Sequence, residues 1–106
     1  MNHGLSADTV VKIHSIFSRF PGIDKAILYG SRAKGNYKTG SDIDLTLMGK
    51  ELTLGLLGDI AEQLDDLLLP YTIDLSLYTS LGHVKLQQHI DRVGVVFYQR
   101  ETNALR

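Results

Sequence analysis

The chain has 106 residues, of which 43% are apolar and 22% charged, which fits one globular domain with a single core and excludes a disordered chain. The formal net charge of −1 offers no general basic field, so we expect no direct nucleic-acid binding, and the absence of cysteine excludes disulfides and thiolate metal sites. No apolar stretch is long enough to span a bilayer and the N-terminus has no signal-peptide core, so we expect no membrane association and a cytoplasmic location.

Helices and strands are predicted to alternate along the chain. Apolar residues at three- and four-residue steps predict helices, and strict alternation predicts strands. The expected elements are a helix from a cap at Ser6 to Pro21, a strand over 25–29, a helical turn over 31–35, a strand over 42–47, a helix over 53–69, a strand over 71–77, a helix over 81–92 and a strand over 95–98. This order predicts an α+β, two-layer fold, with helices packed on one face of a small mixed sheet. Residues 1–98 form the expected single domain, and residues 99–106 the expected flexible tail.

Three aspartates lie inside apolar runs that are predicted to be strands, where aspartate is depleted. Asp42 and Asp44 alternate with aliphatic residues on one strand, and Asp74 does so on a later strand. Residues two apart on a strand point to the same face, so neighbouring strands would bring the three carboxylates together. Crowded carboxylates repel unless a cation lies between them, and Mg²⁺ binds carboxylate and phosphate oxygens together. We therefore predict that these residues bind metal, with room for two Mg²⁺ ions ~3.5–4 Å apart, and that Asp74 assists deprotonation of an attacking group.

A glycine-serine turn precedes the first acidic pair and is suited to holding phosphates. The segment reads Gly30-Ser31-Arg32-Ala33-Lys34-Gly35. Gly30 allows close approach or a positive φ, and Ser31 opens a helical turn whose free amides favour an anion. Arg32 adds positive charge, and the Ser41 hydroxyl is a further candidate ligand. We therefore predict that Gly30, Ser31, Arg32 and Ser41 bind a nucleotide.

This spacing, Gly-Ser-x10-Asp-x-Asp with a third aspartate on a later strand, resembles the nucleotidyltransferase superfamily that includes DNA polymerase beta. Residues 25–77 carry the resemblance, and Gly30-Ser31 followed by Ser41-Asp42-Ile43-Asp44-Leu45 looks most like the minimal nucleotidyltransferases of the MntA type. No signature position departs from that pattern.

The resemblance implies a nucleotidyltransferase fold and a Mg²⁺-dependent transfer of AMP from ATP to a hydroxyl. By position, Gly30 and Ser31 would hold the triphosphate, Asp42 and Asp44 would bind the metals, and Asp74 would complete the site and act as base. In proteins of the MntA type the acceptor is a tyrosine of a HEPN-domain ribonuclease toxin that is encoded nearby and silenced by the added AMP. The resemblance therefore implies an antitoxin that forms a hetero-oligomer with this toxin.

Each assignment has a purely structural alternative. The first two aspartates could be solvated carboxylates at the start of a strand, and Asp74 could be an exposed residue of a sheet face. The basic residues of the turn could be surface charges, and Ser41 could cap the strand that follows it. The aromatic residues Tyr29 and Tyr37 could stack a base or could simply pack.

Two other classes of function compete with protein adenylylation. The chain could be a non-catalytic binding module that neutralises a toxin by steric contact, or a nucleotidyltransferase that acts on a small-molecule or RNA hydroxyl. The complete set of three aspartates favours catalysis, and the near-neutral charge disfavours RNA, whose binding draws on clustered lysine and arginine.

Overall fold

The computed structural model describes residues 3–100 and contains a four-stranded sheet with four helices. The elements in chain order are α1 (Ala7–Phe17), β1 (Lys25–Tyr29), α2 (Ser31–Lys34), β2 (Ile43–Met48), α3 (Leu54–Asp65), β3 (Ile73–Leu77), a 3₁₀ turn η1 (Tyr78–Ser80), α4 (Val84–Val93) and β4 (Val95–Gln99). This arrangement confirms the expected α+β class.

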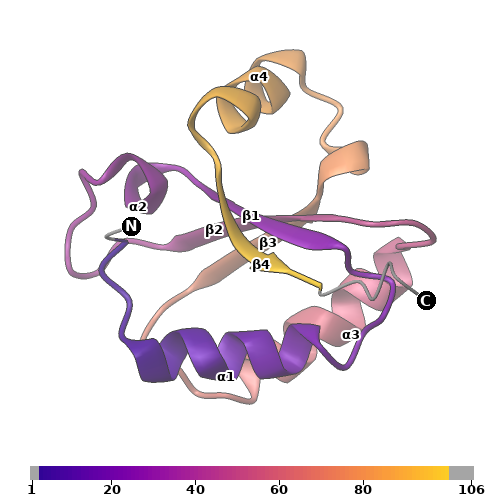
Figure 1. Ribbon diagram of the computed structural model, residues 1–106, viewed down its shortest axis with the longest axis horizontal. Helices are drawn as coiled ribbons and strands as arrows, with labels where there is room; N and C mark the ends of the chain where they lie inside the picture. Colours follow the sequence, from indigo (N-terminus) through magenta and orange to yellow (C-terminus); the bar gives the residue numbers. More distant parts are fainter. Residues whose placement is uncertain (1–2, 101–106) are drawn as a thin grey trace, which may run out of the picture.

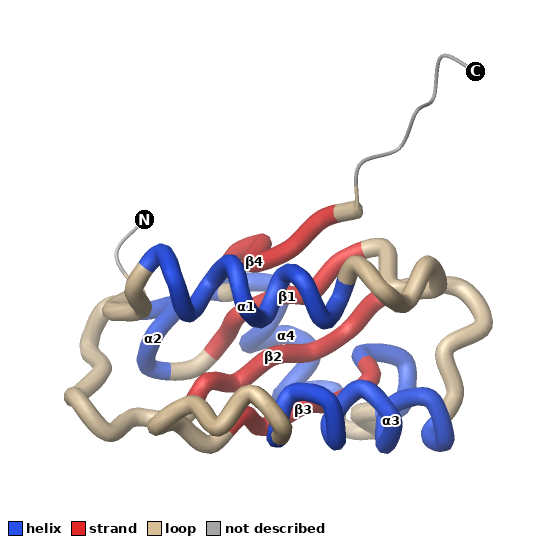
Figure 2. Tube along the Cα trace, turned by 90° about the horizontal axis from the view of Figure 1, so that it is seen from below, coloured by secondary structure: helices blue, strands red, loops and turns tan. Residues whose placement is uncertain are grey.

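The sheet is mixed, with the strand order β3-β2-β1-β4. Strand β1 pairs antiparallel with both β2 and β4, whereas β2 and β3 run parallel. Figure 2 shows the four strands side by side, with β3 and β4 at the two edges. The connection between the parallel strands is made by α3, as parallel pairs require a crossover.

Helices α1 and α3 cover one face of the sheet and bury the main core against it (Figures 1 and 2). The strands alternate, so every second residue points toward these helices. The buried core comprises Ile13, Ile16 and Phe17 of α1, Ile60 and Leu64 of α3, Ala26 and Leu28 of β1, Ile43, Leu45 and Leu47 of β2, Leu77 of β3, Phe97 and Tyr98 of β4, and Ile23. The remaining positions of β2 and β3, including both strand aspartates, therefore point to the opposite face.

Helix α4 lies on that opposite face, which corrects the expectation that all helices share one side (Figure 1). Its inward residue Ile90 is only 3% exposed. A Cβ atom on Gly94, just after the helix, would meet the side chain of Ile27, which alternates with the core residues of β1. The acidic face of the sheet is therefore partly covered, over β1, and not fully open.

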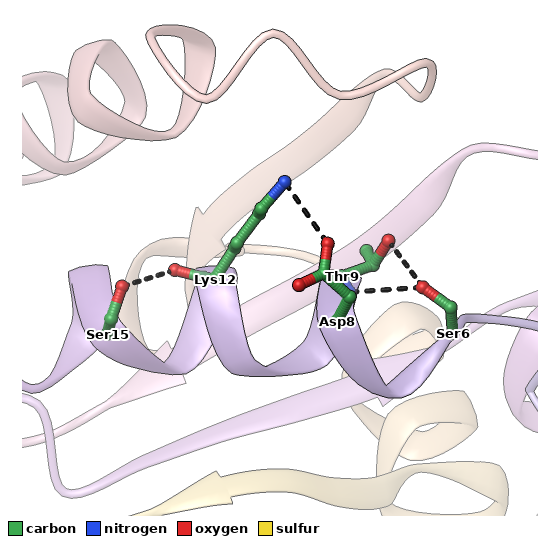
Figure 3. Close-up of polar contacts among 5 residues, drawn as sticks. All are labelled: Ser6, Asp8, Thr9, Lys12 and Ser15. Carbon is green, nitrogen blue, oxygen red and sulfur yellow. Dashed lines mark hydrogen bonds and ion pairs between the residues drawn. The ribbon is translucent and has the colours of Figure 1, made fainter.

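The ends of the helices follow their capping residues. Ser6 caps α1, because its hydroxyl accepts a hydrogen bond from the Thr9 amide at 3.1 Å (Figure 3). Thr53 caps α3 in the same way, with its hydroxyl accepting from the Leu56 amide. Helix α3 ends at Asp65 although leucines continue to residue 69; a turn follows the helix, and Leu68 has a positive φ of 54°, which a continuing helix could not contain. The predicted helix over 53–69 was therefore about one turn too long.

The C-terminal boundary lies later than expected. Gln99 is the last residue of β4, and the Arg100 amide donates to the Asp24 carbonyl at 2.9 Å. The Arg100 guanidinium also pairs with the Asp24 carboxylate at 2.8 Å. The rest of the expected tail, residues 101–106, lies outside the described residues. Within residues 3–100, none of the helices has the length and apolar character that crossing a bilayer would need.

Candidate active site

Two of the three predicted aspartates face each other across the parallel strand pair. Asp44 of β2 is the register partner of Asp74 of β3, and the flanking partners Ile43–Ile73 and Leu45–Leu75 point to the core. Asp44 is half-buried and Asp74 is exposed. The alternation that buries the aliphatic residues thus places both carboxylates on one face, as the sequence predicted.

Asp42 lies one residue before β2 and is exposed. Its charge reaches Asp44, whose pKa lies above its ordinary value of 3.8. Partial burial is the main cause of this higher pKa, followed by repulsion from the negative charges of Asp74 and then Asp42. The three carboxylates therefore form one electrostatically coupled patch.

The patch has the chemistry of a divalent-cation site without being a closed cage. Among residues 3–100, no three acidic, histidine or cysteine side chains are close enough to enclose an ion by themselves. A hard cation at the patch would relieve the repulsion that raises the pKa of Asp44, and Mg²⁺ commonly takes only one or two carboxylates and completes its shell with phosphates and water. The residues present therefore fit Mg²⁺ that arrives with a phosphate-bearing substrate.

The predicted phosphate turn lies directly against this patch. Gly30 has φ 76° and ψ −155°, a conformation that is essentially restricted to glycine. A Cβ atom at Gly30 would collide with a carboxylate oxygen of Asp44. The backbone angles therefore require glycine at residue 30, and Asp44 lies so near that its carboxylate would have to move if a side chain stood there.

Ser31 is the first residue of α2, the single helical turn that follows Gly30. The turn closes at Gly35, which has a left-handed φ of 85° and whose amide donates to the Ser31 carbonyl at 3.0 Å. First-turn amides of a helix have no partner within the helix and carry the positive end of its dipole. The placement of Ser31 is therefore compatible with its predicted contact to a phosphate.

Arg32 occupies a different position from the one expected for a phosphate ligand. Its side chain is only 2% exposed, and its guanidinium donates to the carbonyl oxygens of Ser41, Thr39 and His3. Its donors point into the protein, so a nucleotide contact is not part of this arrangement. The sequence does not reveal this role, because the accepting groups are backbone carbonyls, two in the loop that follows α2 and one near the N-terminus.

Ser41 has a structural role, which was the alternative to its predicted contact with a nucleotide. Its hydroxyl accepts a hydrogen bond from the Lys38 amide at 2.8 Å, which closes the turn just before Asp42. Its carbonyl receives the Arg32 guanidinium at 2.9 Å. Ser41 therefore shapes the backbone that leads into β2.

Tyr29 is buried, in agreement with the packing alternative, and it lies on the acidic face of the sheet. It is the register partner of Asp44 on β1. Burial is the main cause of its raised pKa; a hydrogen bond with Ser76 opposes this shift, and the charges of Asp74 and Asp44 add to it. Its ring also contacts His89 of α4 at a centroid distance of 6.5 Å. The alternation of β1, in which Tyr29 is out of phase with Leu28, is the signal that could have placed it there.

Comparisons with known proteins agree with this geometry. A family model described as polymerase beta, nucleotidyltransferase, matches residues 11–103. No curated protein matches the chain. Similar solved structures include a toxin–antitoxin with AMP-PNP, with a TM-score of 0.69, 21% identity, and coverage of 92% of this chain and 76% of that chain.

Two further solved structures share the architecture. The toxin–antitoxin MntA–HepT has a TM-score of 0.65 and 20% identity, covering 90% of this chain and 74% of that chain. A tri-AMPylated Shewanella oneidensis HEPN toxin in complex with MNT antitoxin has a TM-score of 0.64 and 20% identity, covering 87% and 71%. At these identities the likeness establishes a shared fold.

Proposed function

This chain belongs to the polymerase beta nucleotidyltransferase family, and we propose that it transfers AMP from ATP to a tyrosine hydroxyl of a HEPN ribonuclease toxin and so acts as an antitoxin. The observation that carries the proposal is the contact of Gly30 with the carboxylate of Asp44, which faces Asp74 on the neighbouring strand. A phosphate turn and a carboxylate pair in contact are what a phosphoryl-group transfer needs, because its catalysis consists of positioning and charge stabilisation.

In the proposed reaction, Asp42, Asp44 and Asp74 hold Mg²⁺, and we propose two ions. When bound, Mg²⁺ neutralises charge on the triphosphate and on the reacting oxygens. Because Gly30 has no side chain, a phosphate can approach its backbone beside Asp44, and the amides at the start of α2 would bind the phosphate oxygens.

Asp74 is the proposed base. The acceptor oxygen forms a bond to the α-phosphorus of ATP while the bond from that phosphorus to the bridging oxygen breaks, and pyrophosphate leaves with those electrons. The proton of the acceptor hydroxyl passes to the Asp74 carboxylate, which is exposed and therefore accessible to an acceptor from another chain.

The choice of nucleotide and partner is supported by the structural likenesses. One similar structure contains AMP-PNP, an ATP analogue, and another contains an MNT antitoxin with a tri-AMPylated HEPN toxin. We extend both features to this chain, as a hetero-oligomer with a HEPN toxin. Both ATP and a ribonuclease's RNA substrate are cytoplasmic, so the proposal includes that location.

The test combines the purified chain, ATP, Mg²⁺ and the HEPN protein encoded nearby, followed by mass spectrometry of both proteins. We expect one or more AMP groups on a tyrosine of the HEPN protein, and none when the chain carries Asp44→Asn and Asp74→Asn. Absence of AMP, together with a toxin that the double variant still neutralises, would instead identify a steric binding module. AMP on an RNA end or a small molecule would identify a different acceptor.

A further inference from the structure

The most unusual side chain outside the acidic patch is a buried arginine whose hydrogen bonds, within residues 3–100, all go to backbone carbonyls. Arg32 directly follows Ser31, and its Nε and Nη2 atoms both donate to the Ser41 carbonyl, at 3.1 and 2.9 Å. Nη2 also donates to the Thr39 carbonyl at 3.4 Å, and Nη1 to the His3 carbonyl at 2.9 Å. Burying a charge is costly unless it is hydrogen-bonded, and here backbone carbonyls supply those bonds.

Two aromatic rings complete the surroundings of this guanidinium. Its central carbon lies 5.1 Å from the ring centroid of Tyr37 and 4.9 Å from that of Tyr71. Both distances are within the range of cation–π attraction, and a planar guanidinium can stack on rings while its edge donates hydrogen bonds. A lysine ammonium has neither the fork nor the flat face, so it cannot reproduce this arrangement.

The groups that Arg32 contacts lie next to the metal-binding carboxylates. The Ser41 carbonyl belongs to the same rigid peptide unit as the Asp42 nitrogen, so the guanidinium fork fixes the backbone from which Asp42 projects. Tyr71 stands three residues before Asp74, and the neighbouring Thr72 carbonyl accepts a hydrogen bond from the Ile43 amide at 2.9 Å. One side chain therefore connects the phosphate turn with the start of both acidic strands.

We propose that Arg32 is a positioning residue that sets the Asp42 carboxylate relative to the phosphate turn and thereby determines the affinity of the site for its divalent cation. This inference rests on the proposed metal-dependent function. Outer-shell groups that orient metal ligands typically contribute about 10–100-fold to metal affinity or activity. Arg32 acts through the Ser41–Asp42 peptide, without touching the reacting atoms.

The test is Mn²⁺ binding, measured by electron paramagnetic resonance with a saturating non-hydrolysable ATP analogue and no acceptor protein. We expect Arg32→Lys, which keeps the charge and loses the fork, to raise the half-saturating Mn²⁺ concentration about tenfold. Arg19→Lys is the matched control, because the Arg19 side chain is exposed and its guanidinium donates to the side chain of Gln63 at 2.9 Å, on the helical face away from the carboxylates. The control is expected to bind Mn²⁺ like the unchanged protein.

A second variant keeps the inference testable if Arg32→Lys does not fold. Tyr71→Leu retains an apolar side chain at the core margin and removes one ring from the guanidinium, so it should weaken Mn²⁺ binding in the same direction. A folded Arg32→Lys or Tyr71→Leu protein with unchanged Mn²⁺ affinity would overturn the inference, as would an unchanged protein that takes up no Mn²⁺. Because no acceptor is present, failure of AMP transfer to the toxin would refute the proposed function and leave this result standing.

Discussion

Asp44 and Asp74 occupy the same register position on the adjacent parallel strands β2 and β3. Between aliphatic neighbours that are committed to the core, neither side chain can turn to the other face without a register shift of its strand. The repulsion between them is therefore built into the sheet, and it contributes to the raised pKa of Asp44.

Replacing one of these carboxylates should lower the activity without lowering the stability of the fold. We expect Asp44→Asn to lower the rate of AMP transfer by more than about 100-fold, because even outer-shell groups of metal sites contribute up to that factor. The melting temperature at neutral pH should stay equal or rise, since a neutral amide removes the repulsion from Asp74 and Asp42. The double variant Asp42→Ala/Asp44→Ala should behave in the same way.

The matched control for this variant is Asp59→Asn on the exposed side of α3, which should change neither the transfer rate nor the melting temperature. Wild-type transfer activity in the Asp44→Asn protein would show that the assigned site is wrong.

The pH dependence of the same residue gives a second prediction, with a defined sign. The pKa of Asp44 is raised in the folded protein, so the folded state holds this proton more tightly than the unfolded state does. Protonation of Asp44 therefore stabilises the folded state. This contribution to the free energy of unfolding is fully present below the unfolded pKa of 3.8 and is lost as the pH rises through the folded pKa. The gain in melting temperature of Asp44→Asn should therefore shrink as the solution is acidified through this window.

Metal binding should show the complementary trend, because only the ionised carboxylate is a ligand. Mn²⁺ affinity of the unchanged protein should begin to fall at a pH above 3.8, as Asp44 takes up its proton. An affinity that fell only below 3.8 would contradict a ligand role for an Asp44 with a raised pKa, and the Asp44→Asn variant, whose affinity should lack this step, tests the ligand role directly.

Two glycines with positive φ allow the steric part of the site to be tested. Gly30→Ala and Gly35→Ala both place a Cβ on a backbone with positive φ, left-handed at Gly35 and of the extended, glycine-only kind at Gly30, with a cost on the order of 1–3 kcal/mol in the free energy of unfolding. Only at Gly30 does the new Cβ meet the Asp44 carboxylate, whereas nothing lies within 4 Å of it at Gly35. We expect Gly30→Ala to lose transfer activity at least tenfold and Gly35→Ala to retain it, with urea unfolding used to confirm that both are folded. Equal activity of the two variants would contradict a close packing of turn and carboxylate.

The N-terminal cap of α1 provides a prediction about stability alone. Ser6→Ala removes the acceptor for the Thr9 amide and should lower the free energy of unfolding by about 1 kcal/mol (Figure 3). Ser15→Ala, on the same helix, removes only an exposed contact to the Lys12 carbonyl and should have an effect near zero. Helix α1 lies on the face opposite the carboxylates, so both folded proteins should transfer AMP at the normal rate. A slower transfer by folded Ser6→Ala protein would argue against this separation.

The strands and their acidic face could be predicted because a two-residue period fixes which side chains share a side. Ile43 and Leu45 flank Asp44, and in a half-buried strand this alternation places both aliphatic side chains in the core and the aspartate on the other face. The face that receives α4 could not be predicted in this way. An amphipathic helix reveals which of its own sides is buried, and says nothing of which side of the sheet covers Ile90.

The burial of Arg32 and the end of α3 were hidden for related reasons. The acceptors of Arg32 are backbone carbonyls. Every amino acid has one, so the residue types at positions 3, 39 and 41 do not predict these hydrogen bonds. Leucine rarely adopts a positive φ, so the sequence does not predict one at Leu68. The surrounding run of leucines favours a helix instead.

The alternation of β2 and β3 has a consequence for how such a domain can diversify. Odd positions such as Ile43, Leu45 and Ile73 hold the fold together, while Asp44 and Asp74 on even positions carry the proposed chemistry. Substitution of these two aspartates would therefore change the proposed reaction without unfolding the molecule, and a descendant that lacked them would keep its fold as an inert scaffold.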